Sequence, residues 1–276
     1  MPADAPASHA AEHVRRFDRE RYATALFAPP GPRDGLMVLY AFNLEVARVR
    51  EQVREPMAGL IRLQWWRDVI AEARAGGTER GHPIAGPLAG LIRAHDLPIE
   101  PFERLLAARE LDLRPDPPAD LAAAEDYADA TSASLVELAL RVLGTNSDAA
   151  RPVGVAWSLV GQLRALPFAL STGRLTLPAA VLLEFGTDVA AVQAGRAPKQ
   201  ALIGAVRRVA ERAQEHLNAV RGTRPGQGLP ALLPAVLARV HLHTLAISGF
   251  DPFDARVARP QTAPLRLLWA KLSGRI

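Results

Sequence analysis

The chain has 276 residues, of which 49% are hydrophobic and 22% are charged, and its formal net charge is only +4 at pH 7. Its length and apolar content allow one domain with a sizeable core, and the absence of cysteine excludes disulfides, cysteine nucleophiles and thiolate metal sites. The basic excess is mild and forms no dense stripe interleaved with aromatic residues, so we expect no nucleic-acid partner. Such an excess suits a weak attraction to an anionic membrane surface.

Alanine, leucine and arginine dominate and β-branched runs are short, so intrinsic propensity predicts helix nearly throughout. We therefore expect an all-α fold with one domain over residues 1–276 and a short flexible N-terminus over about residues 1–9. Residues 1–13 have no apolar core of signal-peptide length, and they contain Asp4 and Glu12, which transit peptides avoid. We expect a bacterial, cytoplasmic protein, and the mild basic excess suits a peripheral position on a membrane.

The N-terminal half alternates predicted helices with proline and glycine stops. A helix over 10–27 should end at the three prolines and one glycine of residues 29–32. Asp34 is placed to N-cap the next helix, whose apolar residues recur at helical spacing until Pro56. Further helices are predicted at 57–75, about 83–94 and 98–113, and residues 114–120 are predicted to be a loop.

The C-terminal half is organised around residues 153–166, which are apolar except for Ser158, Gln162 and Arg164. This pattern predicts a helix buried at the centre of the domain. Pro167 should break it and Gly173 should cap its end. An arginine inside this stretch would cost about 2.5 kcal/mol or more at mid-bilayer, so a transmembrane span is rejected. The other predicted helices cover 122–143, a short segment from 179, and 199–221, 230–247 and 264–272.

Residues 162–178 resemble the second signature of squalene/phytoene synthases, the head-to-head prenyltransferases. That signature runs roughly Gln-x-x-Asn-x-x-Arg-Asp-x-x-x-Asp and continues into a Gly-Arg-x-Tyr-Leu-Pro exit. The residues kept here are Arg164, Gly173, Arg174, Leu177 and Pro178, with Gln162 close by. The two magnesium-binding aspartates of the family fall on Ala165 and Ala169. The resemblance therefore implies the scaffold without its metal ligands.

The first signature of the same family places Tyr-Ala-Phe-Cys-Arg before Asp-Asp-x-x-Asp on one helix. Aspartates at i and i+4 lie on one helix face, where they can hold magnesium against a diphosphate. This chain has Tyr40-Ala41-Phe42-Asn43-Leu44-Glu45, followed by Ala47-Arg48-Val49-Arg50-Glu51 at the aspartate positions. One acid of three survives, as Glu51, and Arg48 occupies the middle position.

Residues 41–66 and the Leu-Arg-Ala-x-Pro turn at 163–167 look most like a non-catalytic branch of that family, the complex I assembly factors and their bacterial counterparts. The resemblance implies an isoprenoid-synthase-like helical bundle around a central cavity. It also implies a role in assembling respiratory complex I at the inner membrane, with a complex I subunit or assembly intermediate as partner. We accordingly expect no catalytic residue, no metal and no cofactor, with magnesium needed only by a working synthase.

The candidate residues divide into altered signature positions and cavity residues. The altered positions are Ala47, Arg48, Glu51, Ala165 and Ala169; the candidate cavity or ligand-binding residues are Tyr40, Asn43, Glu45, Arg48, Gln162, Arg164 and Arg174.

Two interpretations of these side chains stay open. Glu45 and Glu51 can pair with arginines at i+3, and burial of Gln162 and Arg164 favours a structural network with Asn43 or Glu45. Alternatively, Arg48, Arg164 and Arg174 can hold a phosphate-bearing group without magnesium.

Three functions compete at this stage. The first is the non-catalytic assembly role. The second is a squalene/phytoene-type prenyltransferase whose acids have moved, for which the sequence offers Glu45, Glu51, Asp68 and Asp112. The third is a carrier of an isoprenoid or an anionic phospholipid. Residues 264–272 admit both a last helix packed on the core and a peripheral membrane contact through Leu268, Trp269 and flanking cations.

Overall fold

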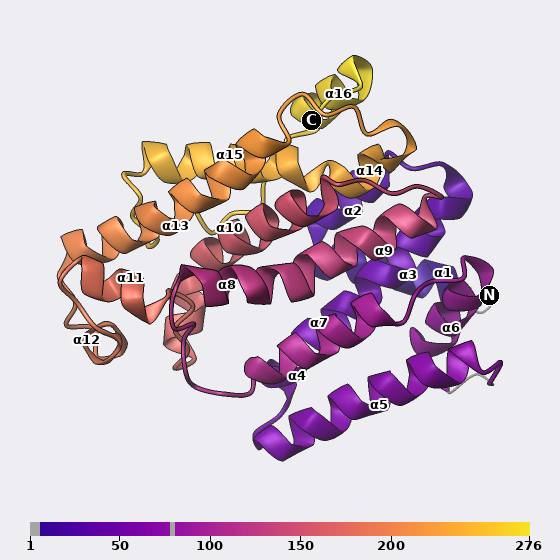
Figure 1. Cartoon of the computed structure of the whole chain (residues 1–276), viewed down its shortest axis with the longest axis horizontal. Helices are drawn as coiled ribbons and strands as arrows, with labels where there is room; N and C mark the ends of the chain where they lie inside the picture. Colours follow the sequence, from indigo (N-terminus) through magenta and orange to yellow (C-terminus); the bar gives the residue numbers. More distant parts are fainter. Residues whose placement is uncertain (1–5, 78–80) are drawn as a thin grey trace.

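The computed structural model describes residues 6–77 and 81–276, and these residues form helices and loops without a β-strand (Figure 1). The N-terminal half contains α1 (Pro6–Phe17), α2 (Arg19–Ala25), α3 (Pro30–Ala47), α4 (Val49–Gln52), α5 (Pro56–Arg74), α6 (Ala85–Ala94) and α7 (Glu100–Leu111). The C-terminal half contains α8 (Leu121–Ala128), a π-helical turn (Asp129–Ala133), α9 (Ser134–Val142), α10 (Ala150–Ser171), α11 (Ala179–Glu184), α12 (Val189–Gln193), α13 (Lys199–Ala219), a 3₁₀ turn (Gly226–Gly228), α14 (Leu229–Leu232), α15 (Pro234–Ile247) and α16 (Pro264–Ser273). The predicted all-α class is confirmed.

Helix α10 lies at the centre of the molecule, as its sequence predicts. It packs against α13 and α15 on one side and against α8, the π turn and α9 on the other (Figure 1). Gly154 allows the close approach of α10 to the π turn, because an added Cβ would lie 2.3 Å from Cα of Ala133. The apolar surface that α10 buries on all sides is the main reason for its central place.

Two predicted helix boundaries are wrong, and each lies at a proline. Pro29 and Pro30 start α3 instead of ending a loop, since a proline in the first helical turn loses no hydrogen bond. Asp34 therefore lies within the helix and is not its N-cap. Pro167 does not end α10, which continues to Ser171. An interior proline costs about 3 kcal/mol, and the packing of α10 against α13 and α15 outweighs that cost.

The helix predicted over 10–27 is interrupted at Asp18. This residue N-caps α2 by accepting a hydrogen bond from the backbone N–H of Arg21 at 2.9 Å, which favours a new helix start. The flexible N-terminus expected over about residues 1–9 falls partly outside the described residues, and α1 already begins at Pro6. The helix predicted over 122–143 contains the π turn between α8 and α9, and α12 was not predicted.

Two helical segments, Ala150–Ser171 and Gly226–Ile247, are long and apolar enough to cross a membrane by composition alone. However, 56% and 72% of the residues in their most apolar windows are buried inside the molecule. Core helices pass the same test of length and hydropathy, so these two segments are weak evidence for membrane spans.

Candidate functional site

A cavity of about 830 Å³ lies between α3 and α10. Asn43 and Ala47 line it from α3, and Trp157, Gly161 and Ala165 line it from α10. The two helices that carry the altered signatures therefore share one central cavity, as predicted. The wall also includes the end of α7, the loop at 114–118, α8, the π turn, residues 172–176, Arg21 of α2 and residues 50, 51 and 53.

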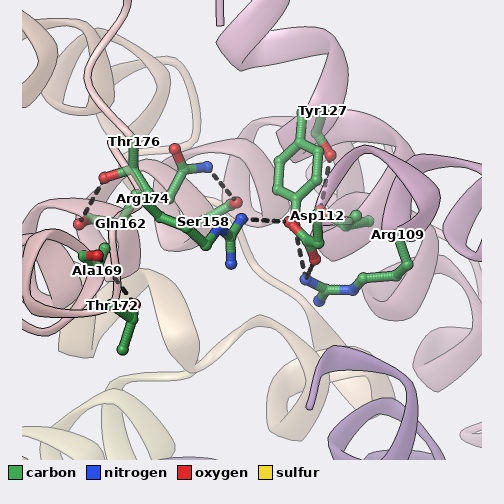
Figure 2. Close-up of polar contacts among 10 residues, drawn as sticks. Arg109, Asp112, Tyr127, Ser158, Gln162, Ala169, Thr172, Arg174 and Thr176 are labelled. Carbon is green, nitrogen blue, oxygen red and sulfur yellow. Dashed lines mark hydrogen bonds and ion pairs between the residues drawn. The ribbon is translucent and has the colours of Figure 1, made fainter. Parts of the chain in front are cut away.

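The cavity contains a buried carboxylate, Asp112, which is only 6% exposed (Figure 2). Nη2 of Arg174 donates to Oδ1 of Asp112 at 2.7 Å, and Nη1 of Arg109 donates to Oδ2 at 3.2 Å. The hydroxyl of Tyr127 donates to Oδ1 at 2.9 Å and accepts from Nη1 of Arg109 at 2.6 Å. Burial raises the pKa of Tyr127, so its hydroxyl keeps its proton and remains a donor. We call these four residues the Asp112 cluster.

Local backbone geometry places Arg174 at this cluster. After α10 ends, Gly173 adopts φ +75°, which an L side chain rarely adopts. The N–H of Arg174 then bonds the carbonyl of Ala169 at 2.8 Å, and the N–H of Gly173 bonds that of Leu170 at 3.1 Å. This pair of hydrogen bonds is a Schellman motif, so the predicted glycine cap is confirmed. It turns the chain back along the cavity wall and brings the Arg174 side chain to Asp112 (Figure 2).

Arg164 belongs to a second buried group, which we call the Glu20 cluster. Its Nη1 donates to Oε2 of Glu20 at 2.8 Å, while Oε1 of Glu20 contacts Nε2 of His241 at 2.5 Å and accepts the backbone N–H of Gln261 at 2.8 Å. Burial alone would raise the pKa of Glu20, but the hydrogen bond from His241 and the charge of Arg164 outweigh it and lower the pKa to about 2. Burial also lowers the pKa of His241, which favours a neutral ring.

The predicted network of Gln162 and Arg164 with Asn43 or Glu45 is wrong. Glu45 contacts Nε2 of His13 at 3.2 Å, and Arg164 leaves the cavity for Glu20. Gln162 lines the cavity and donates to Oγ of Ser158 at 3.3 Å. The reason is the helical geometry of α10, because adjacent residues point about 100° apart and only some of them can face the cavity.

Arg48 also lies away from the cavity, so the proposed trio of Arg48, Arg164 and Arg174 does not form. The Arg48 guanidinium lies 4.4 Å from the ring centroid of Phe17 and donates to Glu51 at 3.5 Å. Glu51 thus pairs with the arginine three residues before it, and the described contacts of Glu45 and Glu51 do not include the predicted pairing with an arginine at i+3. Tyr40 is 3% exposed and does not reach the cavity, and burial raises its pKa to about 12.

Several cavity residues escaped the sequence analysis. Tyr127 and Arg109 were not among the predicted cavity residues, and Asp112 was considered only as a replacement metal ligand. The signal that could have found them is the combination of Arg109 and Asp112 at i and i+3 at the end of a helix. The remaining cations on the wall are Arg21, Arg50 and Arg114.

The family model described as squalene/phytoene synthase matches residues 14–266. This chain belongs to the squalene/phytoene synthase family. Among solved structures, it is similar to the squalene synthase HpnC from Alicyclobacillus acidocaldarius, with a TM-score of 0.77, 20% identity and coverage of 90% of this chain and 95% of that one. A dehydrosqualene synthase structure matches with a TM-score of 0.78, 14% identity and coverage of 97% and 95%. At these identities the two structures establish the fold alone.

Curated relatives of this synthase-family chain carry the name NADH dehydrogenase (ubiquinone) complex I, assembly factor 6. The Bos taurus protein is 28% identical over 93% of this chain and 79% of its own length. The Homo sapiens protein is 27% identical over 91% and 77%, and a homolog from Dictyostelium discoideum is 25% identical over 95% and 74%. The expectation of a bacterial source gains no support from these relatives.

The residues at the altered signature positions do not fit the magnesium site of a squalene/phytoene synthase. Ala47, Ala165 and Ala169 line the cavity but carry no side-chain oxygen. Glu51 is the one acid left at these positions, and it already accepts from Arg48. Hard divalent ions need several oxygen ligands, which these side chains do not supply.

Proposed function

We propose that this synthase-family protein assists the assembly of respiratory complex I and does not transfer prenyl groups. One observation carries the proposal: the cavity and its two helices are retained, while alanines line it where the family places magnesium-binding aspartates. Relatives at 25–29% identity that bear the assembly-factor name support the same role. The partner in this proposal is a complex I subunit or assembly intermediate. This protein would bind it at the inner membrane, where it would itself be peripherally bound.

Gene deletion in the source organism tests the assembly role. We expect less assembled complex I on native gels and lower NADH:quinone oxidoreductase activity, both restored by the wild-type gene. Because the proposal assigns no chemistry to the cavity acids, a Glu51→Gln gene should restore both as well. Unchanged complex I after deletion would contradict the proposal.

The competing prenyltransferase function needs other acidic residues to replace the missing metal-binding aspartates. The contacts of the candidate acids argue against this function. Glu45 contacts His13, and Asp68 accepts a hydrogen bond from Gln64 at 2.9 Å. Asp112 lines the cavity, but Arg109, Tyr127 and Arg174 engage its oxygens. Incubation with farnesyl or geranylgeranyl diphosphate and magnesium should therefore yield no squalene, phytoene or cyclopropyl precursor. Product formed at the rate of a parallel squalene synthase control would overturn the proposal that this protein does not transfer prenyl groups.

A second candidate function is the holding of an anionic lipid or isoprenoid in the cavity without magnesium. Its support is the charge of the wall: five arginines face three acids there. The arginines are Arg21, Arg50, Arg109, Arg114 and Arg174, and the acids are Glu51, Asp112 and Asp116. Guanidinium groups can bind phosphate oxygens directly by paired hydrogen bonds, and Trp157 and Phe168 offer apolar surface for a chain.

Arg174 and Arg48 make a matched pair for testing this second function, since their side chains are 32% and 34% exposed. Only Arg174 lines the cavity. The experiment is a titration with geranylgeranyl monophosphate, monitored by tryptophan fluorescence with and without magnesium. The affinity should fall about tenfold in Arg174→Gln and stay unchanged in Arg48→Gln. Equal effects of the two substitutions, or binding that requires magnesium, would exclude this use of the cavity.

A further inference from the structure

Helix α16 exposes an apolar surface that its packing does not explain. Two of its residues, Leu267 and Ala270, are 1% and 4% exposed and dock the helix on the protein. On its other side four large apolar side chains face outward: Leu265 is 80% exposed, Leu268 47%, Trp269 71% and Leu272 74%. The helix is held in place, because the backbones of Ile276 and Thr223 pair at 3.1 Å and those of Gly222 and Ile276 at 2.8 Å. The exposed side chains thus belong to a docked helix.

These four residues form one stripe. With a turn of roughly 100° per residue, they fall within about 100° of arc, and the buried pair lies on the opposite side. The cations Arg266 and Lys271 lie about 60° beyond the two edges of the stripe. An apolar stripe with a cation on each flank is the pattern of a helix that lies in a membrane interface. We call these four apolar residues and two cations the α16 face.

The surrounding charge favours an anionic partner. Residues 257–276 contain four cations, namely Arg259, Arg266, Lys271 and Arg275, and no aspartate or glutamate. Beside the start of α16, Pro264 and Leu267 border a groove of about 510 Å³ whose lining also includes Arg15, Arg16, Arg19 and Glu12. Negative lipid headgroups attract such clusters by about 1 kcal/mol for each cation near the surface.

We propose that the α16 face docks the protein on an anionic bilayer, with Trp269 and the leucines in the headgroup and acyl boundary and Arg266 and Lys271 at the lipid phosphates. Tryptophan is enriched at this boundary because its ring is both apolar and polar. Helix α16 lies at the outer edge of the molecule, on the side opposite α5 (Figure 1), and residues 6–77 and 81–276 leave its stripe exposed. For its biological setting the inference rests on the proposed membrane-side function, and it names the surface responsible.

Vesicle flotation of the purified full chain tests the α16 face. The vesicles are phosphatidylcholine alone, or phosphatidylcholine with about one third phosphatidylglycerol, at low and at high salt. We expect the wild type to float with the anionic vesicles at low salt. Leu265→Glu/Trp269→Glu should lose at least about tenfold in partitioning, because charged residues replace two exposed apolar side chains. Arg266→Gln/Lys271→Gln should lose on the order of fivefold for each cation.

The matched control is Met57→Glu/Ile61→Glu on α5, since these side chains are also exposed, at 65% and 64%. This control should float like the wild type. All variants change exposed residues, so circular dichroism and urea unfolding should be unchanged. Trp269 supplies a second readout, because its insertion shifts fluorescence to shorter wavelength and Trp269→Phe removes that shift.

Three results would overturn the inference. They are absence of flotation by the wild type, equal flotation of the α16 and α5 variants, and an α16 face that binds a purified complex I subunit but no vesicle. The last result would assign the face to a protein partner. Flotation uses purified protein and lipid alone, so its failure is distinguishable from failure of the assembly role, which gene deletion measures.

Discussion

The Glu20 and Asp112 clusters contain equally buried carboxylates and differ in what encloses their partners. Glu20 and Asp112 are each 6% exposed, and each binds an arginine from the same segment of chain. Around Glu20, His241 is 1% exposed and the Arg164 side chain 13%. Around Asp112, the Arg174 side chain is 32% exposed and lines the cavity. The two clusters therefore differ in the exposure of the arginine and not of the carboxylate. The Glu20 cluster is enclosed, whereas Arg174 of the Asp112 cluster is accessible to a ligand.

Position along α10 explains this difference. Arg164 lies within the helix and reaches Glu20 on α2 and, through it, His241 on α15. Arg174 lies beyond the helix end, where the Schellman motif turns the chain along the cavity wall. Two arginines that the family signature groups together therefore serve two different regions.

The largest expected effect comes from breaking the enclosed cluster. Glu20→Ala leaves Arg164 and His241 buried without their acceptor, and removing one partner of a buried pair costs about 3–5 kcal/mol. Urea denaturation should show this loss in the free energy of unfolding. Glu12→Ala is the matched control, because Glu12 pairs with Arg15 in full contact with solvent and its loss should leave the free energy of unfolding almost unchanged. A loss below about 1 kcal/mol for Glu20→Ala would contradict the structural role.

Acid pH should remove the stabilisation that the Glu20 cluster provides, which lowers the free energy of unfolding by about 3 kcal/mol. The folded pKa of Glu20, about 2, lies below the ordinary value of 4.5. Its contribution to stability is therefore complete above about pH 4.5 and is lost as the pH falls toward about 2. His241 acts in the same direction, because burial lowers its pKa and the unfolded chain binds the proton first. Other carboxylates titrate in this window, so the comparison is between wild type and Glu20→Gln, whose curves should converge at low pH.

The corresponding change in the cavity should cost less. Asp112→Asn keeps the shape but removes the charge between Arg109 and Arg174, and we expect a loss of about 1–2 kcal/mol because cavity water can solvate the freed guanidinium groups. The extra positive charge should also tighten binding of an anionic ligand. Unfolding experiments and titration with inorganic pyrophosphate measure the two effects. A loss as large as that of Glu20→Ala would remove the distinction between the clusters.

The smallest effect concerns Gly161 of α10. An added Cβ at Gly161, which lines the cavity, meets nothing within 4 Å. Gly161→Ala should therefore stabilise the protein by about 0.5–1 kcal/mol through helix propensity. Gly154→Ala serves as the contrast and should destabilise, since its Cβ would press on Ala133. Destabilisation by both substitutions in urea unfolding would show that the cavity wall is closed at Gly161.

The sequence by itself determined the helical class, the central place of residues 153–166, the glycine cap at Gly173 and the family. Each rests on local chemistry: apolar residues on every face of a helix must be buried, and a left-handed cap needs glycine. The order of the motifs also determined that the positions of Ala47 and Ala165 meet at one cavity, which the fold confirms.

Only the tertiary structure decided which polar residues meet. Arg164 could have joined Asn43 or Glu45 by spacing alone, and it binds Glu20, which lies 144 positions away. Local sequence predicts that α10 ends at Pro167, but the helix continues past this proline because it is packed on both sides. The cause is the same in both cases: charge pairs and helix ends each contribute a few kcal/mol, and their outcome depends on burial by segments distant in the chain. The sequence around a residue does not show which distant segments will bury it.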